Sequence, residues 1–346
     1  MSDQSAELRP GAAKPGFKQW LARRMTNIAP FVTLLFLVII FAVMSESFMT
    51  VSNLFNVLRQ ISVTAIIATG LTFVILTAEI DLSIAAVANA VGIVLAFFTA
   101  QESYVAIANV PLPGFAAIII ALCAALGLGI INAIGLTVIG IPSFIMTLAM
   151  MQIGAGISAM LVRGQIAYAV PDVIKELGSG TLLQIGSQSL PWIVVLAALF
   201  LLVGHLVLTY TRFGRYVYMV GGNREAAEYS GVNVKLILAS VMIIGAMCAG
   251  VGGMVGVAYF GSAQQNEFDD YLLDAIAAVV VGGTSLFGGR GGIPNTIVGL
   301  FVLGVLNNGL DHIDIDSFLK VLIRGLILLM ALIINVYAQK LRMARG

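Results

Sequence analysis

Apolar residues run along this chain in long, charge-poor stretches that short polar or glycine- and proline-containing segments interrupt. About 20 apolar residues are enough to cross a hydrocarbon layer of about 30 Å as an α-helix. The pattern therefore predicts ten membrane-spanning helices. They lie near residues 28–45, 60–78, 83–101, 114–133, 142–162, 190–210, 236–258, 273–287, 293–310 and 318–338.

The composition agrees with that pattern. Of the 346 residues, 60% are hydrophobic and 10% are charged, whereas an average soluble domain is roughly 25% charged. We expect an all-α, polytopic membrane protein with some short or broken helices, arranged as two pseudo-repeated halves. Residues 1–27 would precede a transmembrane domain at 28–338, and 339–346 would form a tail. The run 28–45 is longer than a usual signal-peptide core, so it is predicted to be an uncleaved first span.

The basic residues predict the orientation of these helices. Most Lys and Arg residues fall in four segments, 1–27, 211–235, 288–292 and 339–346. With ten spans, all four segments lie on one side, and the positive-inside rule makes that side the cytoplasm. Both termini are therefore predicted to be cytoplasmic.

The predicted outward segments are acidic instead. "NEFDDYLLD" at 266–274 carries four acids, "DHIDID" at 311–316 carries three, and neither contains Lys or Arg. Such charges either hold the span ends in water or form a docking surface for an external partner. The residues alone leave both interpretations open.

A polar island, "YMVGGNREAAEYSGVNV" at 218–234, separates two apolar runs on the predicted cytoplasmic side. A short helix is expected at about 222–232, with Asn223 as N-cap, Glu225 in the first turn and Gly231 as C-cap. Isolated helices this short are marginal in water, so another surface must pack against it. That surface is either a protein partner or lipid headgroups, and the shortness and weak apolar face favour a protein. The residues expected to meet the partner are Arg224, Glu225, Ala226, Ala227 and Glu228.

The same stretch carries a resemblance to a known family. "EAAEYSG" matches the E-A-A-x-x-x-G loop of ABC importer permeases, in which a coupling helix sits in a groove of the ATPase. Four motifs together resemble the ribose, xylose and galactose-type branch of these permeases, from about residue 50 to 338. They are "LTAEIDLSIAA", "GIPSFIMTLAMM", "GRYVYMVGGNREAAEYSGVNV" and "AIAAVVVGGTSLFGGRGGIPNTIVGLFVLGVLNNGL".

The resemblance implies the rest of a transport complex. It implies two permease subunits, identical or not, an ATP-binding ABC subunit with two fused nucleotide-binding domains, and a periplasmic sugar-binding protein. It also implies a bacterial inner-membrane location and places Arg290, in the glycine-rich turn, near the ATPase.

Polar residues inside or beside the spans are candidates for a substrate path. Glu79, Asp81 and Ser83 lie between the second and third spans, where the alternative is that they cap the start of the next helix. Amides inside spans need partners because hydrocarbon offers none, and the alternative to a path is helix-to-helix hydrogen bonding. These amides are Asn89, Asn132, Gln152, Asn307 and Asn308.

Several functions are disfavoured by the sequence. No Lys follows a Gly, so a phosphate-binding Walker A loop is absent, and neither H-E-x-x-H nor G-x-S-x-G occurs. A net charge of +1 without a basic cluster gives no reason to expect nucleic acid. We expect no enzyme activity, cofactor or metal. The resemblance implies the function, import of a monosaccharide, either a pentose or a hexose, or a related polyol, driven by ATP hydrolysis on a separate subunit. The alternative is a secondary sugar transporter driven by an ion gradient.

Overall fold

The structure is a computed structural model that describes residues 17–99, 112–168, 172–185, 188–316, 318–327, 329–330 and 333. Residues 1–16 of the predicted N-terminal segment, the predicted tail 339–346, and the ends of the third and tenth predicted spans lie outside these residues.

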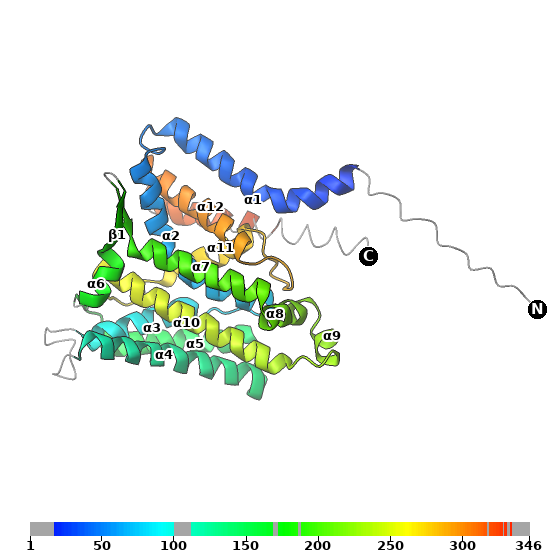
Figure 1. The fold of residues 1–346 in the computed structure, drawn as a ribbon. Helices are drawn as coiled ribbons and strands as arrows, with labels where there is room; N and C mark the ends of the chain where they lie inside the picture. The colour runs from blue at the N-terminus through cyan, green and yellow to red at the C-terminus, as the bar shows by residue number, and fades with distance from the viewer. Residues whose placement is uncertain are drawn as a thin grey trace, which may run out of the picture.

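The described chain is a helical bundle with one small hairpin (Figure 1). Its elements, in order, are α1 (Phe17–Met44), α2 (Val51–Leu76), α3 (Ile84–Phe97), α4 (Gly114–Ile134), the π-helical η1 (Gly135–Ile139), α5 (Ser143–Val162), α6 (Asp172–Ser179), β1 (Thr181–Ile185), β2 (Gln188–Pro191), α7 (Trp192–Tyr210), α8 (Arg212–Gly222), α9 (Arg224–Tyr229), α10 (Val234–Phe260), α11 (Asp269–Val281) and α12 (Ile293–His312). Residues 318–327 are also helical.

Every predicted span contains a helix, although not all of them are long enough to span a bilayer. Among the described residues, six helices are long and apolar enough to cross a membrane: α2, α4 with η1, α5, α7, α10 and α12. The described apolar part of α1, Ala29–Met44, and α3 are apolar but shorter. The polytopic helical class is therefore confirmed, whereas the ten-span count and the repeated halves remain predictions.

Two predicted boundaries are displaced. α2 begins at Val51, nine residues before the predicted start at 60, because Thr50 caps it by accepting a hydrogen bond from the Asn53 amide at 3.3 Å. α11 begins at Asp269 and ends at Val281, so it lies earlier than the predicted 273–287. The interval before α7 was predicted only as an outward segment and holds α6 and the antiparallel pair β1–β2.

The core lies where α2, α3 and α10 pack together. All 14 residues of α3 are buried, and at 1.5 Å per residue the helix is about 21 Å long. α10 approaches its neighbours closely through glycines. At Gly253 a Cβ atom would lie 2.1 Å from the carbonyl oxygen of Ala88 in α3. Close backbone contact is how helices gain packing energy in a membrane.

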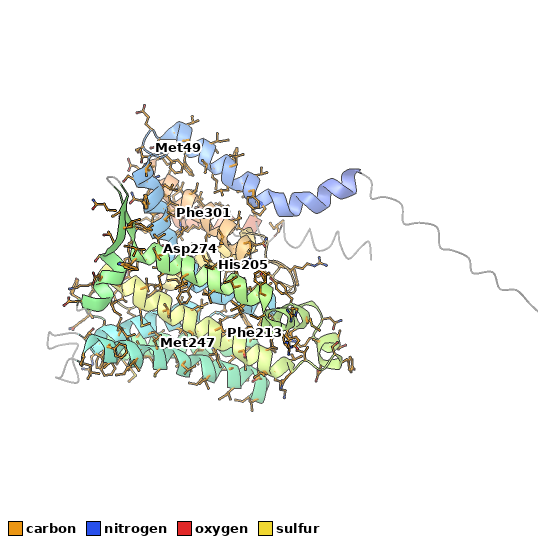
Figure 2. The ribbon with its side chains drawn as sticks, in the orientation of Figure 1. Met49, His205, Phe213, Met247, Asp274 and Phe301 are labelled. Carbon is orange, nitrogen blue, oxygen red and sulfur yellow. The ribbon has the colours of Figure 1, made fainter. Side chains whose placement is uncertain are left out.

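The bundle has two distinct ends. Figure 1 shows α6 and β1 at one end, here called the hairpin end, and α8 and α9 at the other, here called the α9 end. α2 runs along the bundle between the two ends. Figure 2 shows the same separation in its labelled side chains, with Met49 before α2 at one end and Phe213 of α8 at the other.

The close packing of α10 on α3 predicts that Gly253→Ala destabilises the protein. The added methyl group would meet backbone that cannot rotate away, and overpacking of this kind costs about 1–3 kcal/mol. Thermal unfolding of the purified protein in detergent should show a lower midpoint. Gly127→Ala in α4 is the control, since a Cβ there meets nothing within 4 Å. Equal midpoints for the two variants would contradict the packing account.

Candidate functional site

The polar island folds as α9 with a cap at each end, as the sequence predicts. The Asn223 side chain accepts a hydrogen bond from the Ala226 amide at 2.9 Å. At the other end Gly231 has φ +82, a conformation that glycine adopts without strain. Its amide donates to the Glu228 carbonyl at 2.9 Å, and the Val232 amide donates to the Ala227 carbonyl at 3.1 Å. These two bonds form a Schellman motif, which satisfies carbonyls that would otherwise lack donors.

One face of α9 packs against the bundle itself. Ala227 is 1% exposed and Val232 is 7% exposed. Both belong to an apolar cluster that includes Val217 and Val220 of α8 and Phe73 of α2. This packing stabilises a helix that would be marginal alone. The supporting surface is thus the bundle itself, and the prediction that Ala227 meets the partner is wrong, because its side chain is buried within this cluster.

The opposite face of α9 is exposed. Glu225, Ala226 and Glu228 all face solvent, and Tyr229 is 91% exposed. Tyr229 was not among the residues predicted to meet the partner. An aromatic side chain in a run of polar helix formers is the signal that could have found it, because Tyr is enriched among residues that anchor interfaces.

An ion pair joins α9 to the segment after α2. Arg224 Nη2 lies 2.5 Å from Glu79 Oε1, and the Glu79 side chain is only 8% exposed whereas that of Arg224 is 47% exposed. Glu79 is a predicted path residue, and the structure places it at the α9 end as the partner of a predicted coupling residue. An unpaired carboxylate in a buried position is costly, so the Arg224 guanidinium offsets part of the cost of burying Glu79.

A glycine-rich turn completes this end of the molecule. The Gly289 amide donates to the Leu76 carbonyl at 2.9 Å, and the Tyr218 hydroxyl donates to the Gly291 carbonyl at 2.9 Å. Burial raises the pKa of the Tyr218 phenol, which favours the neutral, donating form. We call residues 76–79, 218–231 and 288–291 together the α9 foot.

Arg290 lies in the glycine turn of the α9 foot with its side chain exposed. The foot therefore brings all eight predicted coupling residues to one end of the bundle. They come from segments that are far apart in the sequence.

The second part of the predicted path is a buried polar cluster beside the foot. Asp81 Oδ1 accepts hydrogen bonds from the Ser83 amide at 2.8 Å and from the Ser83 hydroxyl at 2.6 Å. Asn132 Nδ2 in α4 donates to the same hydroxyl at 3.0 Å. The alternative to a path role was that Asp81 caps the next helix. Instead it closes the turn before α3, which begins after Ser83 without a side-chain cap bond.

The start of α5 fastens this turn, a contact that the sequence analysis missed. The Thr147 hydroxyl accepts from the Leu82 amide at 3.1 Å, and the Ser143 hydroxyl accepts from the Ile80 amide at 3.3 Å. Hydroxyls in an apolar helix give little indication of which backbone they will meet.

The remaining predicted path residues are dispersed. Asn89 links α3 to α11 by donating to Asp269 Oδ1 at 2.8 Å and accepting from the Phe268 amide at 2.9 Å. Gln152 is exposed on α5. Asn307 accepts from Arg324 at 3.0 Å. The structure thus does not bring the predicted amides to one site.

Asn308 lies at the hairpin end and lines a polar pocket of about 300 Å³. α2 contributes Asn53, Asn56, Arg59 and Gln60 to the lining. α12 contributes Asn308, Asp311 and His312, and α10 contributes Tyr259. Asn53, Asn56 and Arg59 were missed because the second span was predicted to start at 60, which left these three residues in a loop. Their spacing of three and four places them on one helix face.

Within the described residues no group of three or more His, Cys, Asp or Glu side chains could hold a metal ion. The two ends of the bundle therefore offer an exposed helical foot and a polar pocket, without a recognisable metal centre among those residues.

This architecture defines a polytopic helical membrane protein with a structured polar foot at one end. The chain matches the family described as "Branched-chain amino acid transport system / permease component" over residues 53–332. The protein belongs to this family of transport permeases.

Curated relatives cover most of the chain. The ribose import permease protein RbsC of Escherichia coli K12 is 36% identical over 324 residues, which are 92% of this chain and 95% of the relative. The galactose/methyl galactoside import permease protein MglC of Haemophilus influenzae is 33% identical over 327 residues, 91% of this chain and 95% of the relative. The xylose transport system permease protein XylH of E. coli K12 is 30% identical over 341 residues, 82% of this chain and 85% of the relative. No solved structure matches.

The caps of α9 predict a local effect of Asn223→Ala. Loss of an N-cap side chain typically costs about 1 kcal/mol, so amide hydrogen exchange at residues 226–229 should accelerate about fivefold. Exchange mass spectrometry of the protein in nanodiscs would measure this. Asn233→Ala is the matched control, because Asn233 caps α10 by accepting from the Leu236 amide at 3.0 Å. It should accelerate exchange only at the start of α10, and acceleration of α9 by both variants would contradict independent capping.

Proposed function

We propose that this chain is the membrane-spanning subunit of an ATP-driven importer and that its cargo is a monosaccharide, either a pentose or a hexose, or a related polyol. The relatives support the substrate class, since their names specify import of ribose, import of galactose or methyl galactoside, and transport of xylose. The single structural observation that supports the coupling role is the α9 foot. It presents an exposed helical face while Arg224 ties it to the bundle.

The proposed orientation puts the α9 end in the cytoplasm of a bacterial cell with the bundle in the inner membrane. Arg212, Arg215, Lys235 and Arg290 gather at or beside this end. Glu267 and the acids at the start of α11, Asp269, Asp270 and Asp274, belong to the opposite end. The positive-inside rule supports this orientation.

In this proposal the face of α9 made by Glu225, Glu228 and Tyr229 docks on an ATP-hydrolysing subunit. Closure of the ATPase would push the α9 foot, and the Arg224–Glu79 pair would pass that displacement to the segment that joins α2 and α3. Rigid-body movement of packed helices is a common way to turn a local push into opening at a distance. The chain itself would carry out no catalysis.

The other proposed partners follow from the permease family. A second permease subunit, identical or not, would complete the membrane pore, and a periplasmic binding protein would deliver the sugar at the hairpin end. No structural observation favours an ion-gradient mechanism, so the secondary transporter is not proposed.

A charge exchange tests the mechanical role of the ion pair. We expect Arg224→Glu and Glu79→Arg each to lower sugar uptake roughly tenfold, because each leaves like charges facing one another in a partly buried site. The double exchange should restore much of the uptake. Uptake by cells that express the variants with the ATPase and binding protein would be measured with radiolabelled D-ribose, D-galactose and D-xylose.

The control for the charge exchange is Arg215→Glu, an exposed arginine on the neighbouring α8 that forms no ion pair among the described residues. It should leave uptake near the wild-type rate. The ATPase should still copurify with the Glu79→Arg variant, because Glu79 is buried and the docking face made by Glu225, Glu228 and Tyr229 is unchanged. A double exchange that is as inactive as the single variants would count against the ion pair as the link.

Tyr229→Ala tests the docking face separately. Removal of an exposed aromatic anchor from an interface typically costs about 2 kcal/mol or more, so copurification of the ATPase should fall at least tenfold. Tyr168→Ala is the control, since Tyr168 is also an exposed tyrosine, at 67%, but lies after α5 at the hairpin end of the bundle, away from α9. Undiminished copurification by the Tyr229 variant would reject this face as the docking surface.

A further inference from the structure

The polar pocket at the hairpin end has a rigid floor. Asn53 Nδ2 donates to the Phe48 carbonyl at 2.9 Å and to Asn308 Oδ1 at 2.8 Å. The first of these bonds fixes the orientation of the amide, so Asn53 Oδ1 faces His312 Nε2, 3.0 Å away. Because an amide oxygen only accepts, His312 carries a proton on Nε2. Its Nδ1 lies 3.0 Å from the Ser47 hydroxyl.

The walls of the pocket, unlike its floor, offer polar groups that are not used by the protein. The Gln60 Oε1 atom is buried and has no hydrogen-bond partner among the described residues. Among those residues, Arg59 forms no ion pair, and the exposed side chain of Asn56 forms no hydrogen bond. A buried acceptor without a donor costs about 1–3 kcal/mol, which a ligand hydroxyl would recover.

The composition of the lining suits a small polyhydroxylated ring. Amides such as Asn56 and Gln60 both donate and accept, as sugar hydroxyls do, and Arg59 adds further donors. The ring of Tyr259 is 36% exposed and offers an apolar surface beside these groups. A volume of about 300 Å³ is at the lower end of the range for small-molecule sites, which fits a single sugar unit.

The two helices that supply most of the lining also reach the α9 foot. α2 ends at Leu76, whose carbonyl accepts from Gly289, and α12 begins directly after the glycine turn. Between the two ends, the buried hydroxyls of Thr72 and Thr296 lie 2.8 Å apart and join the helices again. Asn53 and Asn308 join them at the pocket. Displacement of the foot would therefore reach the pocket through both helices.

We propose that this pocket is the site at which the permease receives the monosaccharide from the binding protein, with Asn56, Arg59 and Gln60 contacting its hydroxyl groups. This inference rests on the proposed function. It adds a position for the sugar that the predicted path residues do not provide, since only Asn308 is shared.

Removal of the unpaired wall amides tests the site. The variants are Asn56→Ala, Gln60→Leu and the double variant, in the complete importer reconstituted with its ATPase and binding protein. The probe is whichever of radiolabelled D-ribose, D-galactose and D-xylose the wild-type importer takes up. We expect each single variant to lower uptake about threefold and the double variant about tenfold.

ATP hydrolysis stimulated by the binding protein should change less than twofold in these variants, because the α9 foot is intact. The matched control is Gln165→Leu, an exposed glutamine after α5 that lies outside the pocket. It should leave uptake unchanged. A double variant that transports as well as this control would overturn the proposal.

A second measurement does not depend on removing polar groups. Asn56→Cys in a Cys123→Ser background places one accessible thiol in the pocket, since Cys248 is buried. A membrane-impermeant thiosulfonate should label it from the outside and block uptake. The labelling rate is measured during ATP turnover with the binding protein present, once with sugar and once without. We expect the sugar-loaded binding protein to slow labelling at least threefold. Equal labelling rates would overturn the proposal.

The outcomes separate the two levels of inference. If the wild-type importer and the double variant take up the sugar equally well, only the proposed role of the pocket is wrong, and the proposed function stands. If the wild-type importer takes up none of the three sugars, the proposed cargo is wrong. The proposal that the pocket receives that cargo is then wrong as well.

Discussion

The organisation of this molecule depends on α2 being held at both of its ends. Near its start, the Asn53 side chain bonds to α12. At its other end, the carbonyl of its last residue, Leu76, bonds to the glycine turn, and the Glu79 carboxylate just beyond it bonds to α9. The helix between them is a continuous hydrogen-bonded rod whose last 15 residues are all buried. A buried rod with fixed ends cannot bend locally without breaking contacts, because packed interiors are nearly incompressible. Displacement of one end must therefore move the other end or separate α2 from α12.

The sequence predicted the helical class and several helices accurately for physical reasons. α5 and α7 each start within two residues of the prediction and end where it places them. A proline precedes each start, and an arginine within two residues of each end interrupts the apolar run. The caps of α9 were predicted because Asn223 and Gly231 act within their own turn. Local interactions between near neighbours in the chain are what a sequence records most directly.

The features that escaped prediction arise from contacts between distant segments. Glu79 and Arg224 are 145 positions apart, so neither residue indicates the other. The pocket was missed for a different reason. The charge of Arg59 was taken as the end of a loop, so Asn53 and Asn56 before it were not assigned to a helix. A long cationic side chain is nevertheless tolerated near the end of a membrane helix, because it can extend toward water. Some amides that were predicted to line a path because they lie within spans form hydrogen bonds between helices instead, as Asn89 does with α11.

The Schellman motif and the buried Ala227 have one more consequence. They give α9 its final shape within the isolated subunit, before any partner is present. An incoming protein would not have to order this segment, and the conformational entropy normally lost on association would already have been lost during folding. Assembly of the proposed complex would then be limited by diffusion and orientation, and the lifetime of the complex, set by its dissociation rate, would be the quantity that evolution could adjust.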